Sequence, residues 1–391
     1  MWAMSDRDRV AAAAAGKLGA AKEIPAAVVG FDGFIDEIID VVDQRRDMTP
    51  RGYERIRTIS EYAARVGAAA GKSSNLEMVV KEVRWGGNGP LMAGGLASLG
   101  SGVTYIGSVG EGPDSKALDS RYAELAKRCR KVIPIAPPAH TDALEFEDGK
   151  IMLGKPGNVQ IPTWARLVDV VGIETLVEIV DSAGLVGMVN WVMMGGVEGI
   201  WEGLIDSVLP RLSKNANRRV FIDLADPAKR TDEDVRRAMG ILKRMNALIP
   251  VTLGLNQAEA ERMASVFGVG VFREEQHRTM GVAVQAAAVA LREAMGLACV
   301  VVHPREGAGA ALLSDRGVEA AWFEGPFTPT PRLSTGAGDH FNAGFALGLM
   351  LGMSVEESLA IGCGTSGAYV RDAQSPTRER LVEFLRSLSS A

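Results

Sequence analysis

The residues best suited to chemistry lie in one short segment near the end of the 391-residue chain. Gly336, Ala337 and Gly338 form a predicted tight turn, and the apolar residues that follow recur every four positions, as on one face of a helix. The unpaired N–H groups of a helix start make a seat for an anion such as a phosphoryl group. Asp339, the next residue, could accept the proton of an attacking hydroxyl. Alternatively, it only caps the helix.

Two acids follow the first apolar run of the chain, residues 26–31, which predicts a buried strand. Asp32 and Asp36 would then lie at the carboxyl end of a strand, where open parallel sheets bind ligands. Carboxylates there suit the hydroxyls of a sugar, which need hydrogen-bond acceptors. The structural alternative is that both acids cap a turn.

A second glycine-rich turn precedes a predicted helix that ends at residue 100. Gly86 and Gly87 would let backbone amides approach a ligand closely. Asn88 could donate hydrogen bonds to hydroxyls and accept them. A turn of two glycines before a helix is common, so this feature alone is weak.

Two further polar sites follow predicted strands in the second half of the chain. Asn256 and Glu259 have the spacing of a helix capping box, and spacing alone favours that role. They could also organise water around Mg²⁺ near phosphates. His303 ends an apolar strand and is either a nucleotide contact or, as we favour from its position alone, a polar strand end.

The elements that must position these residues alternate between strand and helix along the chain. This alternation predicts an α/β fold, a three-layer αβα sandwich with a mostly parallel central sheet. Asp-Gly within residues 143–153 predicts a β-hairpin, and residues 53–66 form a predicted helix in a polar insertion. We expect one domain over residues 1–391 and a small β lid from inserted segments near 37–84 and 140–164.

Composition narrows the class of partner. The chain is 47% hydrophobic and 23% charged, with a net charge of −5, which permits a large core and disfavours nucleic acid and anionic membranes. Its three cysteines lack metal-ligand spacing with the histidines, so we expect them to be reduced and buried. No apolar run is long enough to span a bilayer and no signal peptide is evident, so we expect a cytoplasmic protein.

Taken in order, these motifs resemble those of the ribokinase-like carbohydrate kinases, the family that includes phosphofructokinase B. The resemblance rests on Asp36, on residues 86–88, 256–259 and 336–339, and on the residues that flank the last motif. It implies that Asp339 is the general base and that Gly336, Ala337 and Gly338 form the anion hole. It further implies two groups of binding residues: Asp32, Asp36, Gly86, Gly87 and Asn88 for the acceptor, and Asn256, Glu259, His303 and Asn342 for the nucleotide, with Glu259 on the metal side.

The chain also departs from the family pattern. Leu91 replaces an acceptor-binding asparagine, Leu333 replaces an aspartate tied to monovalent-cation binding, and His303 begins a segment that replaces the usual Thr-x-Gly. Residues 32–37, 86–88 and 143–153 are also similar to ADP-dependent sugar kinases.

We therefore expect a kinase that uses ATP and Mg²⁺ and phosphorylates a sugar, nucleoside or polyol. The alternatives are ADP as donor or a non-catalytic sugar or nucleotide sensor, and a homodimer could form through the lid. A dinucleotide-dependent oxidoreductase is disfavoured because no G-x-G-x-x-G follows the first strand.

Overall fold

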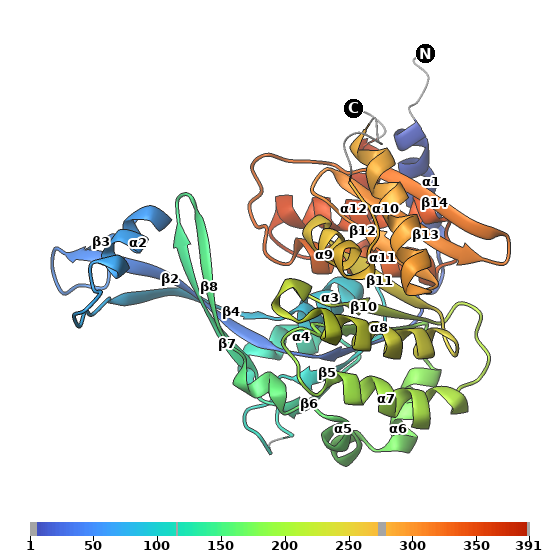
Figure 1. The fold of residues 1–391 in the computed structure, drawn as a ribbon, viewed down its shortest axis with the longest axis horizontal. Helices are drawn as coiled ribbons and strands as arrows, with labels where there is room; N and C mark the ends of the chain where they lie inside the picture. Colours follow the sequence, from blue (N-terminus) through green and yellow to red (C-terminus); the bar gives the residue numbers. More distant parts are fainter. Residues whose placement is uncertain (1–5, 115, 273–278, 389–391) are drawn as a thin grey trace.

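The computed structural model describes residues 6–114, 116–272 and 279–388, so both ends of the predicted domain lie outside the described residues. The predicted α/β sandwich is confirmed: a nine-stranded sheet lies between two layers of helices (Figure 1). Its strand order is β14-β13-β12-β11-β10-β9-β1-β5-β6. The strands from β12 to β6 pair in parallel, and β13 and β14 pair antiparallel at one edge.

The central strands are apolar on both faces because helices cover both faces. Val28 and its pairing partner Val186 pack into one core, whereas the neighbouring residues Ala27 and Leu185 pack into the other. The strands are β1 (Ala27–Phe31), β5 (Val103–Ser108), β6 (Lys131–Ala136), β9 (Leu185–Val189), β10 (Arg219–Asp223), β11 (Val251–Leu255), β12 (Cys299–Val302), β13 (Gly307–Ser314) and β14 (Gly317–Glu324).

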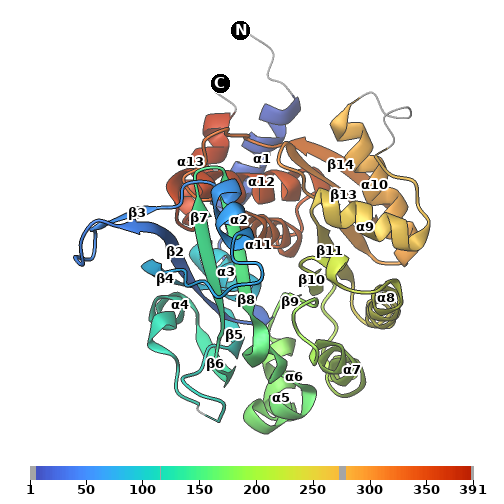
Figure 2. The same ribbon diagram turned by 60° about the vertical axis from the view of Figure 1, so that its left-hand side comes forward.

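Each helical layer contributes its apolar side chains to one of these two cores, and Figure 2 shows the helices on the two sides of the sheet. The first layer comprises α5 (Trp164–Val171), α6 (Ile173–Asp181), α7 (Val197–Ser207), α8 (Asp232–Asn246), α9 (Gln257–Phe267) and α10 (Met280–Met295). The second comprises α1 (Asp6–Ala20), α3 (Asn88–Ser98), α4 (Ala123–Arg128), α11 (Ala337–Met350), α12 (Val355–Asp372) and α13 (Arg378–Leu388). Short 3-10 helices are η1 (Ser120–Tyr122), η2 (Pro156–Gln160), η3 (Leu209–Arg211) and η4 (Pro227–Lys229).

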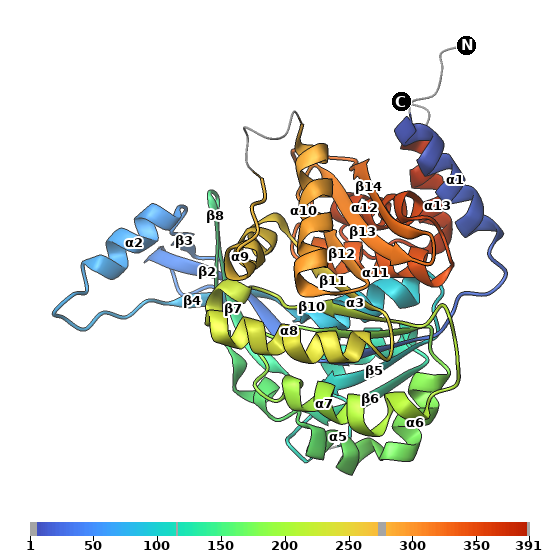
Figure 3. The same cartoon turned by 45° about the vertical axis from the view of Figure 1, so that its right-hand side comes forward.

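A second, smaller sheet projects from the body of the molecule, at the left of Figures 1 and 3. Its strands are β2 (Phe34–Arg45), β3 (Tyr53–Arg55), β4 (Met78–Gly86), β7 (Ala139–Phe146) and β8 (Gly149–Lys155), accompanied by the helix α2 (Ile59–Gly67). The order is β3-β2-β7-β8, with β4 also paired to β2. The predicted hairpin is the β7–β8 pair. Ile39, Val41 and Leu144 form a separate small core against α2.

Two local expectations were wrong in this region. Asp36 does not lie at the carboxyl end of the first strand, as Asp32 does, because it belongs to the long strand β2. Apolar and polar residues do not alternate along β2, in which Ile38 and Ile39 are adjacent, as are Val41 and Val42, so the pattern by which a half-buried strand is recognised is missing. The expected helix over 53–66 begins only at Ile59, after the cap Thr58, because residues 53–55 pair with β2 instead.

All three cysteines are buried and none is in a disulfide. Within the described ranges, no helix combines the length and the apolar composition that crossing a bilayer requires.

Candidate active site

Polar residues gather where five neighbouring parallel strands of the large sheet end. In the order of β1, β9, β10, β11 and β12, the residue that ends or follows the strand is Asp32, Asn190, Asp223, Asn256 and His303. Because these strands are parallel neighbours, their carboxyl ends form one edge, the edge at which open sheets bind ligands. The sequence identified three of these residues. Asn190 and Asp223 were missed, although each follows a short apolar run, the same signal that marked Asp32.

Asp32 is fully buried and its hydrogen-bond partners are internal. The backbone amides of Asn88 and Gly89 donate to its carboxylate at 3.0 and 2.8 Å, and Nδ2 of Asn190 donates at 2.7 Å. Burial raises the pKa of Asp32 to about 6, and these donors oppose that shift. Asp32 thus holds the first turn of α3 and places the Asn88 side chain.

Asp339 lies in the first turn of α11, after Gly336, whose φ of 86° favours glycine. Asp339 is 7% exposed, and its carboxylate accepts a 3.0 Å hydrogen bond from Nδ2 of Asn88. The structure therefore brings the two predicted glycine-rich motifs together across 251 positions of the chain. Burial, followed by the charges of Asp223 and Asp32, raises the pKa of Asp339 well above its ordinary value. Such a carboxylate holds a proton more tightly than an exposed one, as a proton acceptor must.

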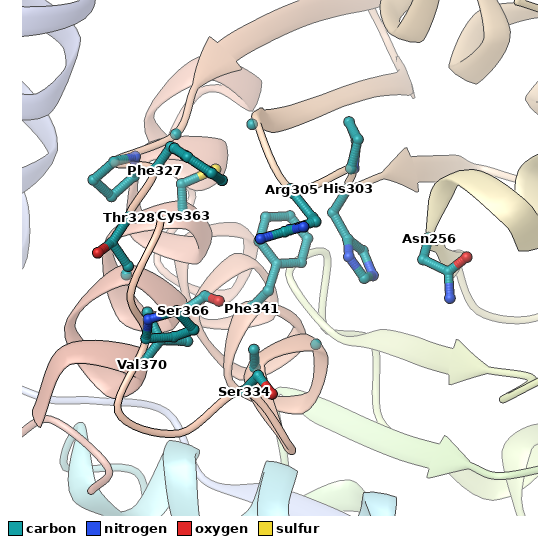
Figure 4. Close-up of a pocket in the computed structure, with 18 residues that line it drawn as sticks. Asn256, His303, Arg305, Phe327, Thr328, Ser334, Phe341, Cys363, Ser366 and Val370 are labelled. Atoms are coloured by element: carbon teal, nitrogen blue, oxygen red, sulfur yellow. The ribbon is translucent and has the colours of Figure 1, made fainter. Parts of the chain in front are cut away.

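A cavity of about 590 Å³ opens beside the start of α11 (Figure 4). Ala337 and Gly338 form one part of its wall, and His303 and Asn256 from the sheet edge form another. This volume lies within the range typical of sites for small ligands. The cavity therefore adjoins the predicted seat for an anion.

The same cavity has an aromatic and basic rim that the sequence did not predict. Arg305 lies over the ring of Phe327 with its guanidinium carbon 5.5 Å from the ring centre, and Phe327 is 52% exposed. The ring centres of His303 and Phe341 are 4.6 Å apart. Burial lowers the pKa of His303 to about 4, so this ring is neutral at neutral pH.

A second, much smaller cavity of about 70 Å³ lies under the small sheet. Asp36 and Gly86 line it from β2 and β4, and Leu91 occupies the position that the resemblance assigns to a polar residue. Nζ of Lys150, on β8, is hydrogen-bonded to Oγ1 of Thr335 in the loop before α11. The small sheet therefore touches the loop that leads to Asp339.

The two glycines of this region have clear steric roles. A side chain at Gly86 would collide with the carboxylate of Asp36, and Gly87 has a φ of 100°. Burial is the largest influence on Asp36 and raises its pKa, whereas a hydrogen bond with Thr141 lowers it.

Asn256 and Glu259 form the capping box expected from their spacing. Oδ1 of Asn256 accepts from the Glu259 amide at 3.0 Å, and Glu259 accepts from the Asn256 amide at 2.9 Å. Burial, followed by the charge of Asp223, raises the pKa of Glu259 to about 9. Within residues 6–114, 116–272 and 279–388, no group of three or more histidine, cysteine or acidic side chains could by itself hold a metal ion.

Asn342 is fully buried on α11, and the cavity wall does not include it. Its Nδ2 donates to Oδ2 of Asp223 at 2.7 Å. The backbone amide of Ala225 also donates to Asp223, at 2.7 Å. Asn342 thus ties the helix that carries Asp339 to the carboxyl end of β10.

Comparison with known proteins places these features in context. The family model described as prokaryotic ketohexokinase matches residues 5–388. A ketohexokinase from Haloferax volcanii is 30% identical over 357 residues, which cover 91% of this chain and 89% of that protein.

Among solved structures, ribokinase from Arabidopsis thaliana complexed with ribose and ATP matches with a TM-score of 0.58 at 18% identity, covering 93% of this chain and 99% of that one. A mutant of phosphofructokinase-2 from Escherichia coli matches with a TM-score of 0.62 at 15% identity, covering 94% and 100%. At these identities the structural likeness shows the ribokinase-like fold.

Proposed function

The chain belongs to the prokaryotic ketohexokinase family, and from that premise we propose that it transfers the γ-phosphoryl group of ATP to a hydroxyl of a ketohexose. It is a carbohydrate kinase, so the predicted resemblance to ribokinase-like kinases is confirmed, and the sensor and oxidoreductase alternatives give way. The observation that supports the proposed chemistry is the buried Asp339, which lies beside a cavity and is held by Asn88.

In this proposal the Asp339 carboxylate accepts the proton of the acceptor hydroxyl as its oxygen attacks the γ-phosphorus. The bond from the acceptor oxygen to phosphorus forms while the bond from phosphorus to the β–γ bridging oxygen breaks, and ADP leaves. The amides of Gly336, Ala337 and Gly338 would stabilise the charge on the phosphoryl oxygens. Asn88 would orient the carboxylate through its 3.0 Å hydrogen bond.

The cavity of about 590 Å³ beside the start of α11 would hold the nucleotide, and we call it the nucleotide-side cavity. Ala337 and Gly338 line it at the start of α11, where unpaired backbone N–H groups suit phosphates. Phe327 lies at its rim, where an aromatic ring suits the flat face of a base. His303 and Asn256 line the remaining side.

Mg²⁺ fits the side of the site at Glu259. Burial, followed by the charges of Asp223, Asp226 and Asp339, raises the pKa of this carboxyl, and a bound cation would offset these charges. Glu259, with Asn256 beside it, would hold the ion together with phosphate oxygens and water, the ligands Mg²⁺ prefers. Bound Mg²⁺ supplies neutralisation of the phosphate charge.

The sugar would bind beneath the small sheet, against Asp36, Gly86, Gly87 and Asn88. A cavity of about 70 Å³ is far below the roughly 300 Å³ at which small-ligand sites begin, so this region must open to admit a ketohexose. The small sheet, built from the segments predicted near 37–84 and 140–164, would act as the lid. Asp32 and Asn342 would act as positioning residues because their side chains contact other protein groups.

A donor and acceptor screen tests the proposal. The full-length protein is assayed for phosphoryl transfer with Mg²⁺, crossing ATP and ADP with a ketohexose, an aldohexose, a nucleoside and a polyol. We expect the highest kcat/KM for ATP with the ketohexose. Preference for ADP would contradict the proposed donor, and preference for another acceptor class would contradict the proposed substrate.

A further inference from the structure

A third cavity, of about 630 Å³, lies near the active site but shares no wall residue with the nucleotide-side cavity. The two cavities meet at the loop before α11: Pro331 and Ser334 line the first, and Arg332 lines the third. We call the third cavity the arginine cavity because Arg128, Arg332 and Arg380 line it.

Within the part of the chain that the structure describes, two of these arginines have no ion pair. Arg380 is paired with Asp372 at 2.9 Å. Among the described residues, the guanidinium groups of Arg128 and Arg332 form no hydrogen bond or ion pair with another side chain, and both residues are exposed. A pocket with surplus positive charge in a chain of net charge −5 favours an anion. The planar fork of an arginine matches phosphate oxygens in particular.

A chain of hydrogen bonds links this cavity to the anion turn. Ser375 lines the cavity, and its Oγ lies 2.8 Å from Nε2 of His340. Nδ1 of the same ring lies 2.7 Å from the carbonyl oxygen of Gly336. The His340 ring also stacks on Tyr369, with ring centres 3.6 Å apart.

The direction of these bonds follows from the charge of the ring. Burial lowers the pKa of His340 to about 4, so the ring is neutral and carries one N–H. The Gly336 carbonyl can only accept, so Nδ1 carries the hydrogen and Nε2 accepts from the Ser375 hydroxyl. The single hydroxyl hydrogen of Ser375 is therefore committed to His340.

We propose that the arginine cavity binds a small phosphate-bearing anion that inhibits the enzyme. Arg128 and Arg332 would bind the phosphate oxygens, and the Ser375 hydroxyl would turn to donate to the anion instead of to His340. Because the His340 ring would lose one of its two hydrogen-bond partners, its hydrogen bond to the Gly336 carbonyl would weaken. The anion turn at 336–338 would then bind nucleotide phosphates more weakly.

Binding is tested by calorimetric titration of inorganic pyrophosphate into the full chain without Mg²⁺. We expect saturable binding that the double substitution Arg128→Gln and Arg332→Gln weakens at least roughly tenfold, since hydrogen bonds to charged groups are lost. Two matched controls should leave this affinity unchanged: Arg130→Gln, outside the cavity, and Arg305→Gln, in the nucleotide-side cavity. Binding that survives the double substitution, or that only Arg305→Gln removes, would overturn the proposal.

The source of the anion is tested by competition. A ketohexose phosphate that displaces pyrophosphate would indicate inhibition by product. A second equivalent of ATP that binds the unsubstituted chain, but not the chain with both Arg128→Gln and Arg332→Gln, would indicate inhibition by nucleotide, because ATP in the active site alone would also weaken pyrophosphate binding. If the ketohexose phosphate does not displace pyrophosphate and no second equivalent of ATP binds, the cavity holds an adventitious ion only and the proposal fails.

The link to the anion turn is tested by the affinity for a non-hydrolysable ATP analogue with and without saturating pyrophosphate. We expect pyrophosphate to weaken analogue binding several-fold in the unsubstituted protein. Ser375→Ala should bind pyrophosphate but show no such weakening. An equal effect in Ser375→Ala and the unsubstituted protein would overturn the link. The measurement needs no turnover, so its failure is distinct from failure of the proposed kinase activity.

Discussion

At the scale of single residues, the proposed chemistry depends on how tightly Asp339 holds a proton. Burial and the neighbouring acids Asp223 and Asp32 raise the pKa of this carboxyl, and the hydrogen bond from Asn88 lowers it. The ionised form is the one that accepts a proton, so Asn88 both orients the carboxylate and keeps it ionised at lower pH.

We predict that Asn88→Ala moves the acidic limb of the pH profile of kcat/KM to higher pH. Loss of the hydrogen bond removes an influence that lowers the pKa of Asp339, so the carboxyl stays protonated up to a higher pH. The initial rate of transfer, measured over a range of pH, checks this. Asn215→Ala, an exposed position, serves as control. An acidic limb that does not move, or that moves to lower pH, would show that Asn88 does not tune Asp339.

A second residue-scale prediction concerns Glu259, whose pKa is raised to about 9. At pH 7.5 this carboxyl is protonated without a cation, and Mg²⁺ binding would ionise it, so binding of Mg²⁺ with nucleotide should release a proton. Titration calorimetry in buffers of different ionisation enthalpy measures that release. Glu259→Gln should abolish it, while Glu261→Gln, in the exposed next turn, should retain it. Equal proton release in both variants would rule out the proposed role of Glu259.

At the scale of elements, the small sheet contacts the loop before α11 through Lys150 of β8 and Thr335. We predict that Lys150→Ala raises the KM for the sugar roughly fivefold, the equivalent of one hydrogen bond of about 1 kcal/mol. Steady-state kinetics with varied sugar checks this. Lys155→Ala is the matched control, because Lys155 lies on the same strand but pairs with Asp142 of the neighbouring strand. If both variants raise the KM equally, closure through Lys150 is refuted.

The packing of α11 against α12 gives a prediction about stability. A Cβ atom on Gly348 would lie 2.6 Å from the Cα of Ser358, so the two helices would have to move apart. We expect Gly348→Ala to destabilise the fold by about 1–3 kcal/mol and to lower the thermal midpoint. Gly240→Ala in α8 has open space around it and should be neutral or slightly stabilising. Thermal unfolding of both variants measures this difference. Equal thermal midpoints for Gly348→Ala and Gly240→Ala would contradict the close packing of α11 against α12.

Elements whose signal is local were predictable from the sequence. The turn and helix around Gly336, the hairpin β7–β8 and the capping box at Asn256 each need only a few adjacent residues, and all three are present. The strand β2 was not predictable because its adjacent apolar pairs, Ile38–Ile39 and Val41–Val42, interrupt the alternation of residue types.

At the scale of the whole molecule, what the sequence could not show is which distant residues meet. Three hydrogen bonds of the site join segments more than 100 positions apart: Asn88 to Asp339, Asn342 to Asp223, and Lys150 to Thr335. Such contacts depend on strand order and helix packing, which the residues near each group do not encode. The motifs thus predicted the parts of the site, whereas the fold determines which of them touch.

The arrangement of the two sheets also separates the proposed binding events. The nucleotide-side cavity opens at the edge of the large sheet, and the cavity of about 70 Å³ lies beneath the small sheet. A hydrogen bond joins Asp339 at the start of α11 to Asn88 at the start of α3. Pairing of two chains through the free edge of the small sheet stays a prediction.

The most direct test of the account is phosphoryl transfer from ATP to a ketohexose by Asp339→Asn. The substituted side chain keeps the size of the original but cannot take the proton of the hydroxyl. We predict that kcat falls by roughly 10²–10⁴-fold while the affinity for an ATP analogue and the thermal midpoint stay close to those of the unsubstituted protein. Full kcat in a folded, nucleotide-binding Asp339→Asn protein would contradict the assignment of Asp339 as the base.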